Sequence, residues 1–152
     1  MDDSTACFIC HKHPQWPAAL RIHADELGIV THASGDLIYH GYLYVEPRRH
    51  APGWEDLTST EAAHLGRLLR QSSQALRAVG CDHVYAFVYG DAVPHLHVHL
   101  VGRWPGAPKE YRTVKTAEWA RAPRSALADI NRFTDSLRAA FGQLSGNPSI
   151  PD

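Results

Sequence analysis

The chain has 152 residues, of which 44% are hydrophobic, which is enough for one domain with a buried core and too few for two. Its 15 basic and 16 acidic residues give a formal net charge of -1, which argues against nucleic acid or an anionic membrane as a partner. Because no apolar run could span a bilayer and Met1-Asp2-Asp3 does not resemble the start of a signal peptide, we expect a cytoplasmic protein.

Two cysteines near the amino terminus have metal-binding spacing. Cys7 and Cys10 form a Cys-x-x-Cys pair, which in a reducing compartment favours a metal over a disulfide. His11 and His13 follow directly and are local candidates for further ligands. The third cysteine, Cys81, is predicted to be a small buried apolar residue.

The first half of the chain predicts two strands and a helix. Residues 28–32 and 36–46 have strand character, and the turn-forming residues 33–35 separate them. Thr58 and Glu61 have the spacing of a capping box, and apolar residues at helical spacing follow as far as Gly80. We therefore expect a hairpin followed by one long helix.

A pair of strands is predicted next, and the second carries three histidines. Residues 83–89 alternate in strand fashion, and Gly90-Asp91 leads toward residues 95–101. There imidazole and aliphatic side chains alternate, so His95, His97 and His99 should share one face of a strand while Leu96, Val98 and Leu100 are buried on the other. Imidazole serves as nucleophile, acid, base or metal ligand, so this face is a candidate reactive surface. The alternative is that the three are ordinary histidines on the protein surface.

The carboxyl-terminal part predicts a second helix at about residues 125–141, with an apolar side formed by Leu127, Ile130, Phe133, Leu137 and Phe141. The fold class is therefore α+β with an antiparallel sheet. We expect a single domain over residues 1–143 and a disordered tail over residues 144–152.

The segment from Pro94 to Val101 is similar to the signature of the histidine triad (HIT) family, His-φ-His-φ-His-φ-φ, where φ is hydrophobic. Residues 41–50, which end in Pro-Arg-Arg-His, resemble the family's strand that ends in Pro-Lys/Arg-x-His. The resemblance covers roughly residues 5–105. It implies a HIT-like antiparallel sheet with one central helix and a C-terminal helix, activity on a nucleotide, and a homodimer.

The resemblance also implies roles for two histidines. Hydrolysis of a phosphate ester or anhydride needs a nucleophile, neutralisation of charge and a proton for the leaving group. His97 matches the family's nucleophile, which forms a phosphoramidate that water cleaves, and His99 matches a phosphate contact and proton donor. Because residue 99 is histidine and not glutamine, the chain resembles the hydrolase branches more than the uridylyltransferase branch.

In zinc-containing branches of the family, the residues that match His50 and His95 complete a site with two cysteines. The resemblance therefore implies a structural zinc held by Cys7, Cys10, His50 and His95, with His11 and His13 as the local competitors.

The substrate pocket is less clearly marked. Asp36 or Ser34 are candidates for the ribose hydroxyls, although both also suit a simple turn before a strand. Asp91, near the place where the family often has a glutamine or serine that contacts the substrate, is a candidate replacement for that contact, although a carboxylate there would repel phosphate. Arg103, just after the triad strand, is a candidate phosphate contact or an ordinary exposed arginine.

We therefore expect a nucleotide hydrolase that acts through a covalent nucleotidyl-His97 intermediate, with the nucleotide itself open. Three alternatives remain at this point. They are a nucleotidyl transferase, a metallohydrolase in which His95, His97 and His99 together bind a catalytic zinc, and a nucleotide sensor without turnover.

Overall fold

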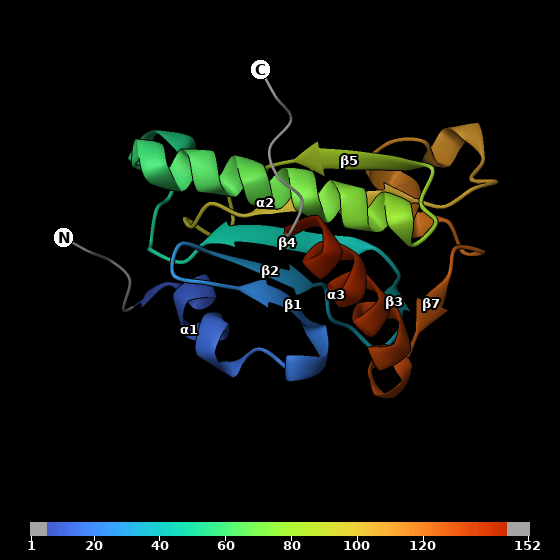
Figure 1. Cartoon of the computed structure of the whole chain (residues 1–152). Helices are drawn as coiled ribbons and strands as arrows, with labels where there is room; N and C mark the ends of the chain where they lie inside the picture. Colours follow the sequence, from blue (N-terminus) through green and yellow to red (C-terminus); the bar gives the residue numbers. More distant parts are fainter. Residues whose placement is uncertain (1–5, 146–152) are drawn as a thin grey trace, which may run out of the picture.

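A computed structural model describes residues 6–145 and shows a five-stranded antiparallel sheet at its centre (Figure 1). The order of the strands across this sheet is β1-β2-β4-β6-β5. Their bounds are Arg21–Ala24 for β1, Gly28–His32 for β2, Tyr42–Pro47 for β4, Val98–Arg103 for β6 and His83–Phe87 for β5. The predicted α+β class with an antiparallel sheet is confirmed.

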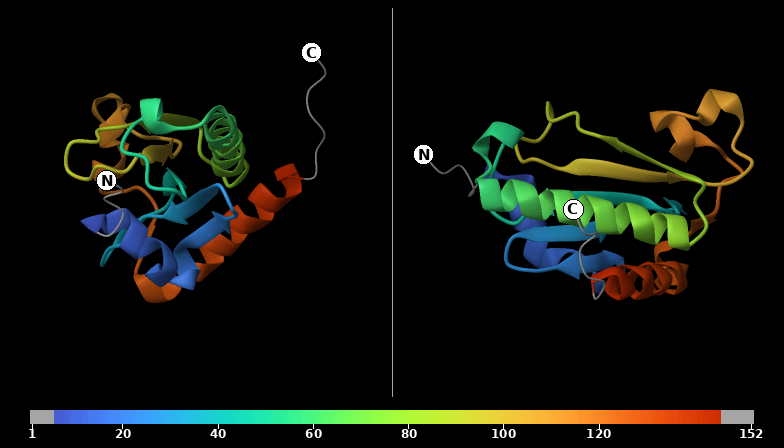
Figure 2. Two further views of the ribbon diagram at one scale, coloured as in Figure 1. Left: turned by 90° about the vertical axis from the view of Figure 1, so that its left-hand side faces the viewer. Right: turned by 45° about the horizontal axis from the view of Figure 1, so that its top comes forward.

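Three helices pack on the two faces of the sheet. The long helix α2 (Ser59–Ala78) and the terminal helix α3 (Asn131–Ser145) lie together on one face, and the short helix α1 (Phe8–Gln15) lies against the other (Figure 2). None of the helices in residues 6–145 is both long enough and apolar enough to cross a membrane.

Helix α2 forms where its capping box and leucine spacing predict it. The Thr58 side chain accepts a hydrogen bond from the Glu61 amide, and the Glu61 carboxylate accepts one from the Thr58 amide. The helix ends before Gly80, whose φ of +116° is easily adopted only by glycine. Leucines of α2 pack on the inner residues of β4 and β6, and the core includes Leu43, Val45, Leu65, Leu68, Leu76, Leu96, Val98 and Leu100.

The prediction of one long strand over residues 36–46 is wrong, because a turn interrupts the strand in its middle. A short strand β3 (Ile38–Tyr39) precedes the break and pairs with β7 (Arg124–Ser125) in a separate two-stranded sheet, while β4 starts at Tyr42. Gly41 makes the break, since its φ is +92°. The turn redirects the chain so that β4 pairs with both β2 and β6.

Three other predicted boundaries differ. The histidine strand begins only at Val98, so His95 and His97 lie in the segment that leads into β6. The preceding strand ends at Phe87 and not at residue 89. The second helix begins at Asn131 because residues 124–125 are recruited into β7, which leaves Leu127 in a 3₁₀ turn with 43% of its surface exposed. Helix α3 continues to Ser145, and residues 146–152 of the predicted tail lie outside the described residues.

Candidate active site and metal centre

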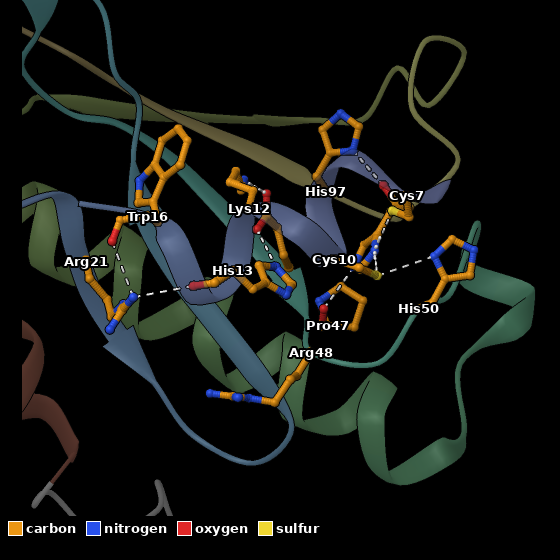
Figure 3. Close-up of polar contacts among 12 residues, drawn as sticks. Cys7, Cys10, Lys12, His13, Trp16, Arg21, Pro47, Arg48, His50 and His97 are labelled. Carbon is orange, nitrogen blue, oxygen red and sulfur yellow. Dashed lines mark hydrogen bonds and ion pairs between the residues drawn. The ribbon is translucent and has the colours of Figure 1, made fainter. Parts of the chain in front are cut away.

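Four potential metal ligands lie close together beside the end of strand β4. Cys7 immediately precedes α1, Cys10 lies in its first turn, and His50 lies in the loop after β4 (Figure 3). His95 comes from the segment before β6. Their ligand atoms all lie within 4.8 Å of one another. Three segments far apart in the sequence therefore meet at one point.

The geometry and chemistry of this group fit a tetrahedral zinc ion. The Sγ atoms of Cys7 and Cys10 lie 3.5 Å from Nδ1 of His95, and Sγ of Cys10 lies 3.7 Å from Nδ1 of His50. Zinc bonds to sulfur and imidazole nitrogen predict ligand-to-ligand separations of about 3.3–3.8 Å in a tetrahedron. Two thiols and two imidazoles are also a donor set that zinc prefers.

The surroundings of His95 hold its ring in the form that binds metal. Its Nε2–H donates to the Pro47 carbonyl oxygen at 2.9 Å, so Nδ1 carries the lone pair that faces the cysteines. Burial lowers the pKa of His95 to about 4, so the ring is neutral at pH 7. Of the local competitors, His13 directs Nε2 to Glu46, and His11 does not belong to the group of four.

His97 lies next to this centre but turns away from it. Its Nδ1–H donates to the backbone carbonyl of His95 at 2.6 Å. This hydrogen bond assigns the proton to Nδ1 and leaves the lone pair on Nε2. A neutral imidazole whose second nitrogen is held in this way is prepared for nucleophilic attack.

His99 is placed across the sheet by its partners on neighbouring strands. Its ring stacks on Phe87 of β5, with centroids 4.9 Å apart and planes 13° apart, and Nδ1 lies 2.8 Å from the hydroxyl of Tyr42 on β4. Burial and the nearby His97 lower the pKa of His99 to about 4. Burial also holds the pKa of Tyr42 well above its usual value, so its hydroxyl keeps its proton.

The proton position at His99 depends on the direction of the hydrogen bond with Tyr42. We assign the Tyr42 hydroxyl as the donor to Nδ1, which places the proton of the neutral His99 ring on Nε2. That Nε2 is buried, and it has no hydrogen-bond partner within residues 6–145. An N–H group without a partner beside a candidate nucleophile is suited to contact a substrate oxygen.

A cavity of about 300 Å³ connects these histidines with α1. Its walls are largely aromatic and apolar, with a few polar groups, which is usual for a small-molecule site. The lining residues are Phe8, Ile9, Lys12, Trp16, Ser34, Tyr44, Glu46, Val93, His97 and His99.

Comparison with known families identifies the fold. The sequence model of the HIT domain matches residues 13–106, which is more than half of the chain. The chain belongs to the HIT family. Of the four potential metal ligands, His50 and His95 lie inside the matched range, and Cys7 and Cys10 lie outside it.

Solved structures share the fold of this chain, and a named relative aligns with part of it. A zinc-bound HIT protein from Mycobacterium smegmatis superposes with a TM-score of 0.68 at 22% identity, covering 93% of this chain and 97% of that one. A hypothetical histidine triad nucleotide-binding protein from Sulfolobus tokodaii has a TM-score of 0.70 at 16% identity, with coverage of 91% and 94%. A Mycobacterium tuberculosis protein named AP-4-A phosphorylase is 29% identical over 132 residues, which cover 66% of this chain and 67% of that protein.

Of the four predicted substrate contacts in this HIT protein, only Ser34 lines the cavity. Asp36 and Asp91 are exposed and are not among the lining residues. Arg103 lies at the far end of β6, where it forms a 2.7 Å ion pair with Asp82. The structure thus gathers the triad histidines and Ser34 but not the other three.

Several cavity residues were not predicted from the sequence. They are Phe8, Lys12 and Trp16 of the α1 region and Tyr44 and Glu46 of β4. Tyr42 of β4, which contacts His99 but does not line the cavity, was not predicted either. The alternation of Tyr42, Tyr44 and Glu46 was a usable signal, because these residues face the same side of a strand that pairs with the histidine strand. The residues of α1 gave no such signal, since only the metal ligands suggest where that helix docks.

Proposed function

We propose that this HIT protein is a nucleotide hydrolase that works through a covalent nucleotidyl-His97 intermediate. The observation that carries the proposal is the hydrogen bond from His97 Nδ1–H to the His95 carbonyl, which leaves Nε2 as a nucleophile at the cavity. The M. tuberculosis relative, named AP-4-A phosphorylase, supports nucleotide chemistry in general.

The reaction proceeds in two displacements at one phosphorus atom. The Nε2 lone pair of His97 forms the N–P bond, and the leaving group departs with the electron pair of the bond that breaks. A water molecule then attacks the same phosphorus and loses its proton to solvent, while the electron pair of the N–P bond returns to His97. His99 Nε2–H stabilises the negative charge on the phosphoryl oxygens in both steps and the negative charge on the leaving group in the first step.

Cys7, Cys10, His50 and His95 would hold a structural zinc. Four protein ligands leave no open position for substrate, so the metal would contribute to folding and not to bond breaking. The alternative of a catalytic zinc shared by the three triad histidines is disfavoured, because His95 directs Nδ1 to the cysteines and Nε2 to Pro47.

Transfer of the nucleotidyl group to an acceptor other than water is the second candidate function, and the word phosphorylase in the relative's name favours it. Hydrolysis and nucleotidyl transfer differ only in the second displacement. Product analysis with and without inorganic phosphate separates them, since phosphorolysis adds a phosphate to the released nucleotide. We also propose a homodimer, which analytical ultracentrifugation would test.

The experiment that tests the proposal is trapping of the intermediate. The enzyme is mixed with a dinucleoside polyphosphate or a nucleoside phosphoramidate and quenched in alkali, where phosphoramidates survive. Intact-mass analysis should show one nucleotidyl group on the wild type and none on His97→Ala. The fraction of protein that carries the group should be larger for His99→Ala if that variant slows the second step. Turnover of His97→Ala should fall on the order of a thousandfold or more. Turnover above about a tenth of the wild-type value would place the chemistry at another residue.

A further inference from the structure

A second buried group of charges lies in the cavity and takes no part in the reaction described above. The ammonium of Lys12 lies 2.6 Å from Oε1 of Glu46, and Nε2 of His13 lies 2.9 Å from Oε2 of the same carboxylate. The exposed fractions are 7% for the Lys12 side chain and 1% for Glu46. Burial alone would raise the pKa of Glu46, but the hydrogen bonds from His13 and Lys12 lower it, so the carboxylate is charged.

The charge of Lys12 is balanced by the carboxylate that it contacts. A neutral ion pair attracts a phosphate weakly, whereas its outer N–H groups still donate hydrogen bonds. The ammonium carries three N–H groups, and the bond to Glu46 uses one of them. Lys12 is therefore better suited to contact a polar, uncharged part of a ligand than to neutralise a phosphate.

The rings around Lys12 indicate what that part of the ligand is. Its ammonium lies 4.8 Å from the centre of the Trp16 ring and 5.3 Å from the centre of the Tyr44 ring. The Tyr44 ring also approaches the triad, with its centroid 5.1 Å from that of His99. A nucleotide whose phosphate contacts the histidines would thus find aromatic surface for its base on the side where Lys12 lies.

We propose that Lys12 is a specificity-determining residue that recognises the edge of the base and favours 6-carbonyl purines, guanine and hypoxanthine, over adenine. An ammonium offers donors and no acceptor. Guanine presents two adjacent acceptors, O6 and N7, whereas adenine replaces O6 with an amino donor that would face the ammonium. Glu46 holds Lys12 in place as a positioning residue. The inference rests on the proposed nucleotide site and adds the base that it selects.

Equilibrium binding of product-like monophosphates tests the proposal without turnover. Isothermal titration calorimetry on the zinc-loaded protein would compare GMP, IMP, AMP and 2-aminopurine riboside 5′-monophosphate, which keeps N7 but lacks O6. GMP and IMP should bind the wild type roughly 10- to 100-fold more tightly than the other two, the range expected for a hydrogen bond to a charged group.

Variants of Lys12 assign the preference to its side chain. Lys12→Met should lose the preference for GMP while its affinity for AMP stays within about twofold, and Lys12→Arg, which keeps the charge and the donors, should retain it. Because Lys12→Met leaves Glu46 buried without its cation, the double variant Lys12→Met/Glu46→Gln removes both charges and should behave in the same way. Zinc content and Tm of each variant show whether α1 is intact.

Two results would overturn the inference and leave the proposed function standing. One is equal binding of GMP and AMP by the wild type. The other is a uniform loss of affinity for all four nucleotides and for inorganic pyrophosphate in Lys12→Met, which would show that Lys12 contacts phosphate. Absence of binding for every nucleotide, together with absence of turnover, would instead overturn the nucleotide site itself.

Discussion

Three imidazoles in one short segment have three different environments. His95 offers Nδ1 to the cysteines, His97 donates from Nδ1 to a backbone carbonyl, and His99 receives a hydrogen bond from Tyr42. In each ring, the partner of one nitrogen determines what the other nitrogen can do. Residue type alone does not distinguish the ligand, the nucleophile and the donor that we propose in this motif.

Tyr42→Phe tests the assignment of the His99 proton. Without the hydroxyl at Nδ1, His99 can place its proton on either nitrogen, so Nε2 loses part of its donor character. We expect kcat to fall about tenfold with little change in KM, because the contact to charge in the transition state weakens more than ground-state binding. Steady-state kinetics measure both constants. Tyr85→Phe, which removes a hydroxyl bonded to the remote Arg103, is the matched control and should leave kcat unchanged.

At the scale of elements, α1 and β4 each serve two purposes. Helix α1 presents Cys7 and Cys10 to the metal centre and Lys12 to the cavity. Strand β4 sends Leu43 and Val45 into the core beneath α2 and its alternate residues toward the triad. The site therefore lies on the face of the sheet opposite to the two long helices. Strand β4 contributes both to core packing on one face and to the geometry of the site on the other.

The end of β2 depends on a histidine that must remain neutral. His32 donates from Nδ1 to the Ala33 carbonyl at 2.9 Å and accepts at Nε2 from the Gly41 amide at 3.0 Å. Burial lowers its pKa from 6.5 to about 4. The folded pKa thus lies below the unfolded one, so the unfolded chain takes up the proton first, and the stability is present above pH 6.5 and lost as the pH falls toward 4.

His32→Gln should remove this part of the pH dependence. Glutamine offers an acceptor for the Gly41 amide but does not titrate. Between pH 7 and pH 5, His32 should cost the wild type about 2 kcal/mol of unfolding free energy. The total loss over this pH range should therefore be about 2 kcal/mol smaller in the variant than in the wild type. Urea denaturation at both pH values measures the difference. Parallel curves for the two proteins would show that another group dominates.

At the scale of the whole molecule, the candidate metal centre brings together segments that are far apart in the sequence. It joins the amino-terminal helix to the loop after β4 and to the segment before β6, which are 40 and 85 residues away from Cys10 in the sequence. A metal bound there would stabilise the folded chain, in which alone the four ligands lie close together, and would hold α1 against the sheet. The position of Lys12 and Trp16 in the cavity would then depend on the metal.

Removal of the metal should therefore destabilise the protein. Chelation, Cys7→Ser or Cys10→Ser should each lower Tm by at least about 5 °C and reduce the zinc content measured by elemental analysis. His97→Ala and His99→Ala should retain one zinc per chain, because neither ring belongs to the group of four. Loss of zinc from His97→Ala would instead support the catalytic-metal alternative.

The sequence by itself determined the features that depend on local spacing. The α+β class, helix α2 with its capping box and the apolar side of the histidine segment follow from periodicity and short-range hydrogen bonds. The complete triad signature was enough for the family resemblance, which the match over residues 13–106 confirms.

Only the tertiary structure decided which distant groups meet. Gly41 breaks the predicted strand, and pairing with β3 draws Ser125 out of the predicted helix, because sheet partners override local propensity. The same holds at the site, where Arg103 lies at the wrong end of β6 and the neutral pair of Lys12 and Glu46 enters the cavity. Contacts across tens of residues depend on the whole packing arrangement, and no local pattern in the sequence records them.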